Sequence, residues 1–215
     1  MIQAVIFDLD GVLVDTAHYH FLAWQRLAKE LGIHFTEQEN EQLKGVSRMR
    51  SLEIILEMGN LQLSLDEMNK LAEKKNKWFV QYINKIKPDE IFPGVKELIQ
   101  RIRESKIKVA LASSSKNANT VLDLLHIKNI FDALVDGTMI THTKPDPEIF
   151  LLAAKKLNVL PSQCLVYEDA EAGVDAALAA GMKCVGVGSP NTLRSAHFVV
   201  AATPEFTLEK IKSIV

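Results

Sequence analysis

The sequence predicts an α/β fold, a doubly wound parallel sheet (Rossmann-like) with a helical cap domain inserted into it. Short apolar runs that end in polar residues recur along the chain, as buried parallel strands do. Helical patterns alternate with these runs from about residue 92 onward, whereas residues 17 to about 87 hold several helical patterns and no convincing strand. In such a sheet, ligands bind beyond the carboxyl ends of the strands.

Five apolar runs predict the strands, and amphipathic patterns predict the helices between them. Residues 95–102 carry apolar side chains at i, i+3, i+4 and i+7, and residues 149–157 approximate that spacing. The predicted strands are residues 4–7, 109–112, 133–135, 165–167 and 184–187.

The segment between the first two predicted strands indicates a separate helical domain. Pro88 and Pro93 mark the return of the chain to the sheet. We therefore expect an α/β core domain at residues 1–15 and 88–215 and a helical cap domain at residues 16–87.

Composition and charge exclude several classes of protein. The 215 residues are 47% hydrophobic and 24% charged, as in globular proteins, and the net charge of -2 provides no field that recruits nucleic acid or an anionic membrane. No apolar stretch approaches the roughly 18 residues of a membrane span, and the N-terminus lacks the basic region of a signal peptide. Cys164 and Cys184 lie in apolar runs, where buried thiols are typical. We expect a monomeric cytoplasmic protein with no nucleic-acid or membrane partner.

Two acidic pairs follow predicted strands. Asp8 and Asp10 are two residues apart, so both can face the site, and Gly11 permits a sharp turn. Glu168 and Asp169 follow a later strand. Either pair alone is also explained by a surface turn or a helix cap, but together they supply the oxygen ligands that Mg²⁺ prefers.

Two further features suit a phosphate group. Residues 113–117, which are rich in serine, follow a strand and precede a helix, so hydroxyls, backbone N–H groups and the helix dipole can converge on an anion. Lys144 lies just before another helix, where its charge can balance a phosphoryl group. Taken singly, a serine-rich loop is usually a turn and a lysine usually solvated surface.

These features occur in the order of the four motifs of the haloacid dehalogenase (HAD) superfamily, which the chain resembles over nearly its whole length. The resemblance implies that Asp8 is the nucleophile that forms an aspartyl phosphate and that Asp10 is the general acid and base. It also implies that Ser113 and Lys144 hold the transferring phosphoryl oxygens. The implied magnesium ligands are Asp8, Asp10 through its backbone carbonyl, Glu168 and Asp169.

Within this superfamily the chain resembles the sugar phosphomutases. Arg48 is the candidate clamp for a second phosphate, because a guanidinium binds phosphate bidentately, although Arg50 follows where the family often has an acidic residue and could compete for that phosphate. The resemblance implies interconversion of β-glucose 1-phosphate and glucose 6-phosphate through β-glucose 1,6-bisphosphate. The implied substrate contacts are Asp10, Thr16, His20, Trp24, Lys44, Gly45, Val46, Ser47, Arg48, Lys75, Ser113, Ser114, Ser115, Lys116 and Asn117.

Alternatives stay open at this point. A HAD-type phosphatase of small sugar phosphates or phosphoglycolate uses the same Asp8 chemistry with water as the acceptor. A phosphoacceptor signalling module also has acidic strand ends, a hydroxyl and a lysine, but it lacks the inserted segment. Thr16, His20 and Lys75 are candidates for linking cap closure to the position of Asp10, whereas His20 could simply pack and Lys75 could belong to a solvated lysine-rich face.

Overall fold

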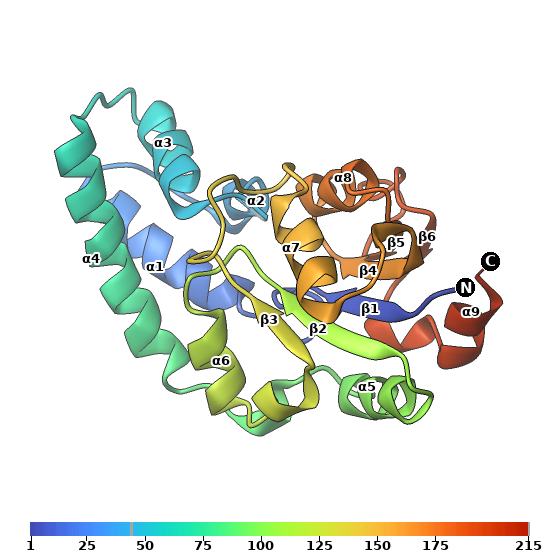
Figure 1. Cartoon of the computed structure of the whole chain (residues 1–215). Helices are drawn as coiled ribbons and strands as arrows, with labels where there is room; N and C mark the ends of the chain where they lie inside the picture. Colours follow the sequence, from blue (N-terminus) through green and yellow to red (C-terminus); the bar gives the residue numbers. More distant parts are fainter. Residues whose placement is uncertain (44, 215) are drawn as a thin grey trace. The chain divides into compact units, whose positions relative to one another are not determined.

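The computed structural model describes residues 1–43 and 45–214, and the chain divides into two compact units (Figure 1). The first unit comprises Met1–Asp15 and Lys87–Val215, and the second comprises Thr16–Ile86.

The first unit is built on one six-stranded parallel sheet with the order β3-β2-β1-β4-β5-β6. The strands are β1 (Ala4–Phe7), β2 (Lys108–Ala112), β3 (Ala133–Val135), β4 (Cys164–Glu168), β5 (Lys183–Val187) and β6 (Phe198–Val200). The α/β fold and all five predicted strands are confirmed. The sequence prediction missed β6, a strand of three residues at the edge of the sheet whose side chains are only partly buried, so its pattern is weak.

Helices cover both faces of this sheet. They are α5 (Val95–Glu104), α6 (Ala118–Leu124), α7 (Glu148–Leu157), α8 (Glu171–Ala179) and α9 (Leu208–Ser213), with short 3-10 helices η1 (Pro88–Glu90), η2 (Lys128–Ile130), η3 (Pro161–Gln163) and η4 (Thr203–Glu205). Helix α7 packs on β1, β2 and β3, and α8 packs on β4 and β5.

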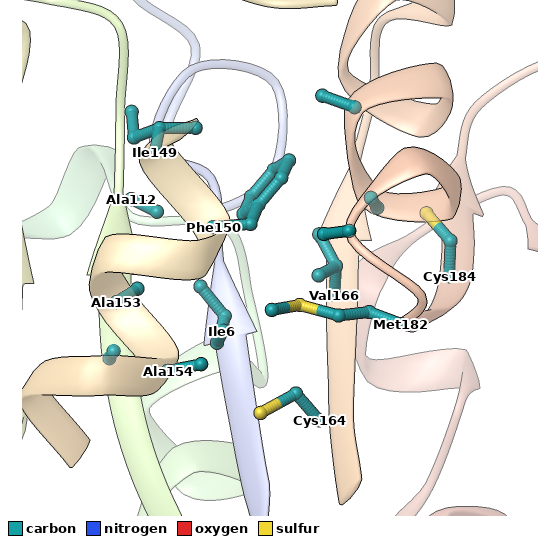
Figure 2. Close-up of a cluster of buried hydrophobic side chains, with 14 of the residues drawn as sticks. Ile6, Ala112, Ile149, Phe150, Ala153, Ala154, Cys164, Val166, Met182 and Cys184 are labelled. Atoms are coloured by element: carbon teal, nitrogen blue, oxygen red, sulfur yellow. The ribbon is translucent and has the colours of Figure 1, made fainter. Parts of the chain in front are cut away.

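Alternation along the strands sends neighbouring side chains to opposite faces. Ile6 and Val166 face α7, where they pack with Phe150 in the cluster that Figure 2 shows. Phe7 and Tyr167 point the other way and stack at 4.8 Å between ring centroids. Both faces of β1 and β4 are therefore buried, which explains their continuous apolar sequences.

The second unit contains four helices within the described residues: α1 (Ala17–Glu30), α2 (Glu37–Glu41), α3 (Arg48–Met58) and α4 (Leu65–Ile83). Helix α4 packs on α1 and α3. Ser64 starts α4 with a reciprocal capping box, in which its hydroxyl accepts from Glu67 N–H and the Glu67 carboxylate accepts from Ser64 N–H. Among the described residues, none of the helices combines the length and the apolar character that crossing a membrane requires.

Candidate functional site

The ends of three adjacent strands bring together residues that are far apart in sequence. The register pairs Phe7 of β1 with Tyr167 of β4 and Leu111 of β2. Asp8 follows β1, and its N–H donates to the Tyr167 carbonyl at 3.0 Å. Glu168 ends β4 and Ser113 follows β2. The first, second and fourth predicted motifs therefore lie along one edge of the sheet.

Lys144 joins this edge from the loop between β3 and α7. Its Nζ donates to Asp8 Oδ1 at 2.5 Å and also to Glu168 Oε1. The side chains are almost inaccessible, with 1% of Lys144, 8% of Asp8 and 1% of Glu168 exposed. The structure thus builds a buried triad in which one ammonium is shared by two carboxylates.

Burial and the neighbouring charges shift the pKa values of Lys144 and Glu168. Burial by itself lowers the pKa of Lys144, but the charges of Asp8 and Glu168 and their hydrogen bonds outweigh burial and raise that pKa above the ordinary lysine value. Burial raises the pKa of Glu168 above its ordinary value, and Lys144 opposes the shift. Lys144 therefore stays charged, because it is the cation that balances two buried acids.

Asp10 lies beside the triad with an unusual acidity. Its backbone N–H donates to Asp8 Oδ2 at 3.0 Å. Burial and then the charge of Asp8 raise the pKa of Asp10 from 3.8 to about 8, with Lys144 opposing them. A raised pKa favours the protonated carboxyl, which is the state that a general acid needs.

The second acidic pair reaches the first through Gly11. This glycine has φ of +74°, and a Cβ built on it would lie 2.1 Å from Asp169 Oδ2. The Asp169 carboxylate therefore lies directly against the chain next to Asp10, and a side chain at Gly11 would displace it.

The donor set fits a hard divalent cation. The structure brings together four carboxylates, those of Asp8, Asp10, Glu168 and Asp169. Among the described residues, the Lys144 ammonium lies between two of them and donates to both. Negative charge exceeds positive charge, and all donors are oxygens, as Mg²⁺ and similar ions prefer. The predicted metal ligands are thus gathered at one place.

The serine-rich loop is ordered by its own hydroxyls. Ser113 is buried, and its Oγ accepts from Ser115 N–H at 3.1 Å, while Ser115 Oγ accepts from Asn117 N–H at 3.2 Å. Helix α6 begins directly afterwards. Ser114 Oγ is buried, and none of the described residues gives it a hydrogen-bond partner. Lys116 is exposed. The loop thus follows β2 beside Asp8, as predicted.

In the second unit, three of the predicted substrate contacts form one cluster. Lys75 is 1% exposed, and its Nζ lies 2.8 Å from His20 Nδ1 and 4.4 Å from the centre of the Trp24 ring. Burial, then the charges of Lys75 and Arg48, hold the pKa of His20 well below its ordinary value. His20 is therefore neutral, so its Nδ1 can accept a hydrogen bond from the Lys75 ammonium. The buried Thr16 precedes α1, and its carbonyl accepts from His20 N–H at 3.0 Å.

The two arginines of α3 occupy different environments. Arg50 is half exposed, and its guanidinium pairs with Glu53 at 3.0 Å and Glu57 at 2.9 Å along the helix. Arg48 is partly buried, and burial lowers its pKa from the ordinary value. The expected competition of Arg50 for a phosphate is thus opposed by its two carboxylate partners.

The residues just before Arg48 shape the start of α3. Ser47 is its N-cap, with Oγ accepting from the N–H of Arg50 at 3.3 Å. Gly45 has a positive φ, and Val46 N–H donates to the Leu43 carbonyl at 3.3 Å. Lys44, also a predicted contact, lies outside the described residues.

A further group of side chains that could hold a metal occurs outside the four motifs. His142, Asp146 and Glu148 place their ligand atoms within 4.8 Å of one another. Glu148, however, accepts from the N–H groups of Thr141 at 2.9 Å and His142 at 2.6 Å, and Asp146 accepts from Glu148 N–H at 2.9 Å. These bonds arrange the start of α7, so we assign the group to capping.

Comparisons with known proteins agree with this geometry. The model of the haloacid dehalogenase-like hydrolases matches residues 2–181, and the chain belongs to that family. Enzymes of this family that transfer phosphoryl groups generally need a divalent metal.

Individual relatives show which members of the family this chain is similar to. The chain is 46% identical over 209 residues to the beta-phosphoglucomutase of Bacillus subtilis, which covers 96% of this chain and 92% of that protein. A crystal structure of beta-phosphoglucomutase from Clostridium difficile superposes with a TM-score of 0.95 at 46% identity, covering 99% of this chain and 96% of that one. A phosphorylated carbohydrates phosphatase of Thermotoga maritima is 33% identical and covers 99% of both chains. The chain is thus a homologue of the beta-phosphoglucomutases that also has phosphatase relatives.

Proposed function

We propose that the chain is a Mg²⁺-dependent sugar phosphomutase, a beta-phosphoglucomutase, that interconverts β-D-glucose 1-phosphate and glucose 6-phosphate. The observation that carries the proposal is the pair at the end of β1, where the Asp10 N–H donates to Oδ2 of the proposed nucleophile Asp8 at 3.0 Å and the Lys144 ammonium donates to its Oδ1. The identity of 46% to a beta-phosphoglucomutase over almost the whole chain supports the choice of reaction. The proposal extends to a cytoplasmic, monomeric enzyme with a small-molecule substrate.

The proposed reaction consists of two transfers that use the same two carboxylates. An oxygen of Asp8 attacks the phosphorus of β-glucose 1,6-bisphosphate, and Asp10 gives its proton to the sugar oxygen that leaves. When the transferred group is the C1 phosphate, glucose 6-phosphate leaves, and a molecule of β-glucose 1-phosphate then presents its C6 hydroxyl to the aspartyl phosphate. Asp10 takes the proton of this hydroxyl as the oxygen attacks the aspartyl phosphate, which frees Asp8. Each cycle returns both residues to their starting protonation states.

Cationic and polar groups around Asp8 suit the transferring phosphoryl group. Lys144 donates to Asp8 in the structure, so its ammonium is within reach of an oxygen added to that carboxylate. Ser113 follows the adjacent strand and can donate its hydroxyl hydrogen. Both would balance the charge that develops on the phosphoryl oxygens.

We propose Mg²⁺ as the divalent cation, held by the side chains of Asp8, Glu168 and Asp169 and by the Asp10 carbonyl. When bound, it offsets the repulsion between the Asp8 carboxylate and the incoming phosphate. Among the described residues, the acidic oxygens outnumber the ammonium of Lys144 that they share, which supports this assignment.

The proposed test supplies the purified protein with Mg²⁺, β-glucose 1-phosphate and a trace of β-glucose 1,6-bisphosphate. We expect glucose 6-phosphate as the main product. Its formation is measured with a coupled glucose 6-phosphate dehydrogenase assay. The phosphatase relative from Thermotoga maritima makes hydrolysis the second candidate. If inorganic phosphate forms faster than glucose 6-phosphate, the chain is a phosphatase and the mutase proposal is wrong.

Arg48→Ala is expected to weaken the mutase through the second phosphate. A charge-assisted hydrogen bond contributes about 1.5 to 3 kcal/mol, so the KM for the bisphosphate should rise roughly 10- to 100-fold. Hydrolysis of a small monophosphate, which has no second phosphate, should change far less. Steady-state kinetics with both substrates measures the difference.

Arg50→Ala is the matched control, since it removes the same charge two residues away on α3. Its ion pairs with Glu53 and Glu57 are largely exposed and screened by water, so they contribute little. The KM for the bisphosphate should therefore stay within about twofold of the wild type. Equal effects of the two substitutions would contradict the assignment of the phosphate to Arg48.

We further propose that Thr16, His20 and Lys75 link movement of the cap to Asp10. The support is the buried contact between Lys75 Nζ and His20 Nδ1, together with the Thr16 carbonyl that receives His20 N–H. Trp24 forms one wall of this cluster.

A further inference from the structure

Asp136 is a buried carboxylate that belongs to none of the four motifs. It follows β3 and is 4% exposed. Its Oδ2 accepts from Asn119 Nδ2 at 2.5 Å, and its Oδ1 accepts from Thr138 N–H at 2.9 Å and from Thr138 Oγ1 at 2.5 Å. Three donors thus compensate the burial of this charge. Two of them belong to its own turn, whereas Asn119 belongs to α6.

The turn that contains Asp136 also fixes the backbone of the serine-rich loop. The Val135 carbonyl accepts from Ser113 N–H at 3.1 Å, and Gly137 N–H donates to the Ser115 carbonyl at 3.3 Å. A Cβ built on Gly137 would lie 2.2 Å from the Ser114 carbonyl oxygen, so a larger residue there would displace the loop. Residues 135–137 therefore contact the first half of the loop.

Asn119 extends this support to the other end of the loop. It is the second residue of α6, two positions after Asn117. Residues 113–117 are consequently held on one side by the backbone of residues 135–137 and on the other by the side-chain bond between Asp136 and Asn119. An ionised carboxylate only accepts hydrogen bonds, so it orients the Asn119 amide with Nδ2 toward it.

We propose that Asp136 and Asn119 are positioning residues that fix the loop of residues 113–117 for binding a phosphate. This inference rests on the proposed function and deepens it, since it states what holds the loop in place. Both Asp136 oxygens already accept hydrogen bonds, from Asn119 and from Thr138, so Asp136 acts through Asn119 and the backbone. Phosphate affinity depends on the placement of N–H and O–H donors to within about 1 Å, so loosening α6 from β3 lowers that affinity.

The test reverses the polarity of the pair. Asn119→Asp sets two carboxylates against each other, and we expect the dissociation constant of inorganic phosphate, measured by calorimetry with Mg²⁺ present, to rise about tenfold. Adding Asp136→Asn restores an amide facing a carboxylate, with the roles exchanged, and leaves an acceptor for Thr138. The double variant should bind phosphate within about twofold of the wild type.

Thr138→Val is the matched control, because it removes a hydrogen bond from the same carboxylate without touching α6. It should lower the thermal midpoint and leave phosphate affinity unchanged. The inference is overturned if Asn119→Asp lowers the midpoint of thermal unfolding but leaves phosphate affinity unchanged. It is also overturned if the double variant binds phosphate as poorly as Asn119→Asp. If the wild type binds phosphate but forms no glucose 6-phosphate, the proposed reaction fails while the loop assignment is still measured. If the wild type binds no phosphate, both are overturned.

Discussion

The Asp8→Asn variant is expected to lose phosphoryl transfer by at least about 10⁴-fold, the scale seen when an enzyme loses its nucleophile. An amide has no anionic oxygen to attack phosphorus, and the substitution also removes the carboxylate that receives the Lys144 ammonium. The measurement is twofold: glucose 6-phosphate formation, and labelling of the protein by a phosphoryl donor in a rapid quench. Both should be absent.

Asp10→Asn is the matched comparison, two residues along the same strand end. The amide cannot donate an acidic proton or accept one, so turnover should fall by about 10² to 10⁴. Asp8 is intact, however, and slow labelling should persist. A variant with normal turnover would refute the role of Asp10 as acid and base, and labelling in Asp8→Asn would place the nucleophile elsewhere.

Lys144→Met is expected to reduce both stability and catalysis. Methionine fills a similar volume but leaves Asp8 and Glu168 buried without their shared ammonium. Removing one partner from a buried ion pair costs about 3 to 5 kcal/mol in the free energy of unfolding. Urea denaturation in the presence of a chelator measures this loss without a contribution from metal.

The pH dependence of the Lys144→Met variant follows from Glu168. Burial already raises the pKa of Glu168 in the folded state, and removing the opposing ammonium raises it further. A folded-state pKa above the unfolded value gives stability that is lost as the pH rises. The loss in free energy of unfolding caused by Lys144→Met should therefore be smaller at pH 5 than at pH 8.

A second substitution provides the control for this effect. Glu168→Gln in the Lys144→Met background removes one of the two uncompensated charges, so part of the lost stability should return while activity stays low. If Lys144→Met unfolds like the wild type, or if the double variant is less stable than Lys144→Met, the triad does not hold the site together as the geometry indicates.

The sequence predicted the interior of the sheet better than its edge, for a physical reason. Strands β1 and β4 are buried on both faces, so their sequences are continuously apolar and end abruptly at Asp8 and Glu168. Strand β6 lies at the edge of the sheet beside β5 and has partly exposed side chains, and the sequence prediction missed it.

The candidate site shows the same division. Three of the four motifs were visible because they end an apolar run, and adjacency in the parallel sheet brings Asp8, Ser113 and Glu168 together. Lys144 was visible because it lies just before a helix. The pairing of Asp136 with Asn119 was not predictable, because it depends on how α6 lies against the end of β3. The contact of Lys75 with His20 was not predictable either, because helical periodicity does not identify a ring nitrogen 55 residues away as a partner.

The order of the strands also bears on how the site forms during folding. Strand β1 pairs with β2 and β4, more than 100 residues further along the chain, and such distant pairings form slowly because a long loop must close first. The helices of Thr16–Ile86 form a compact unit whose internal contacts do not involve β1. Asp8 can therefore meet Lys144, 136 residues further along the chain, and Glu168, which lies further still, only after the residues between them have been synthesised.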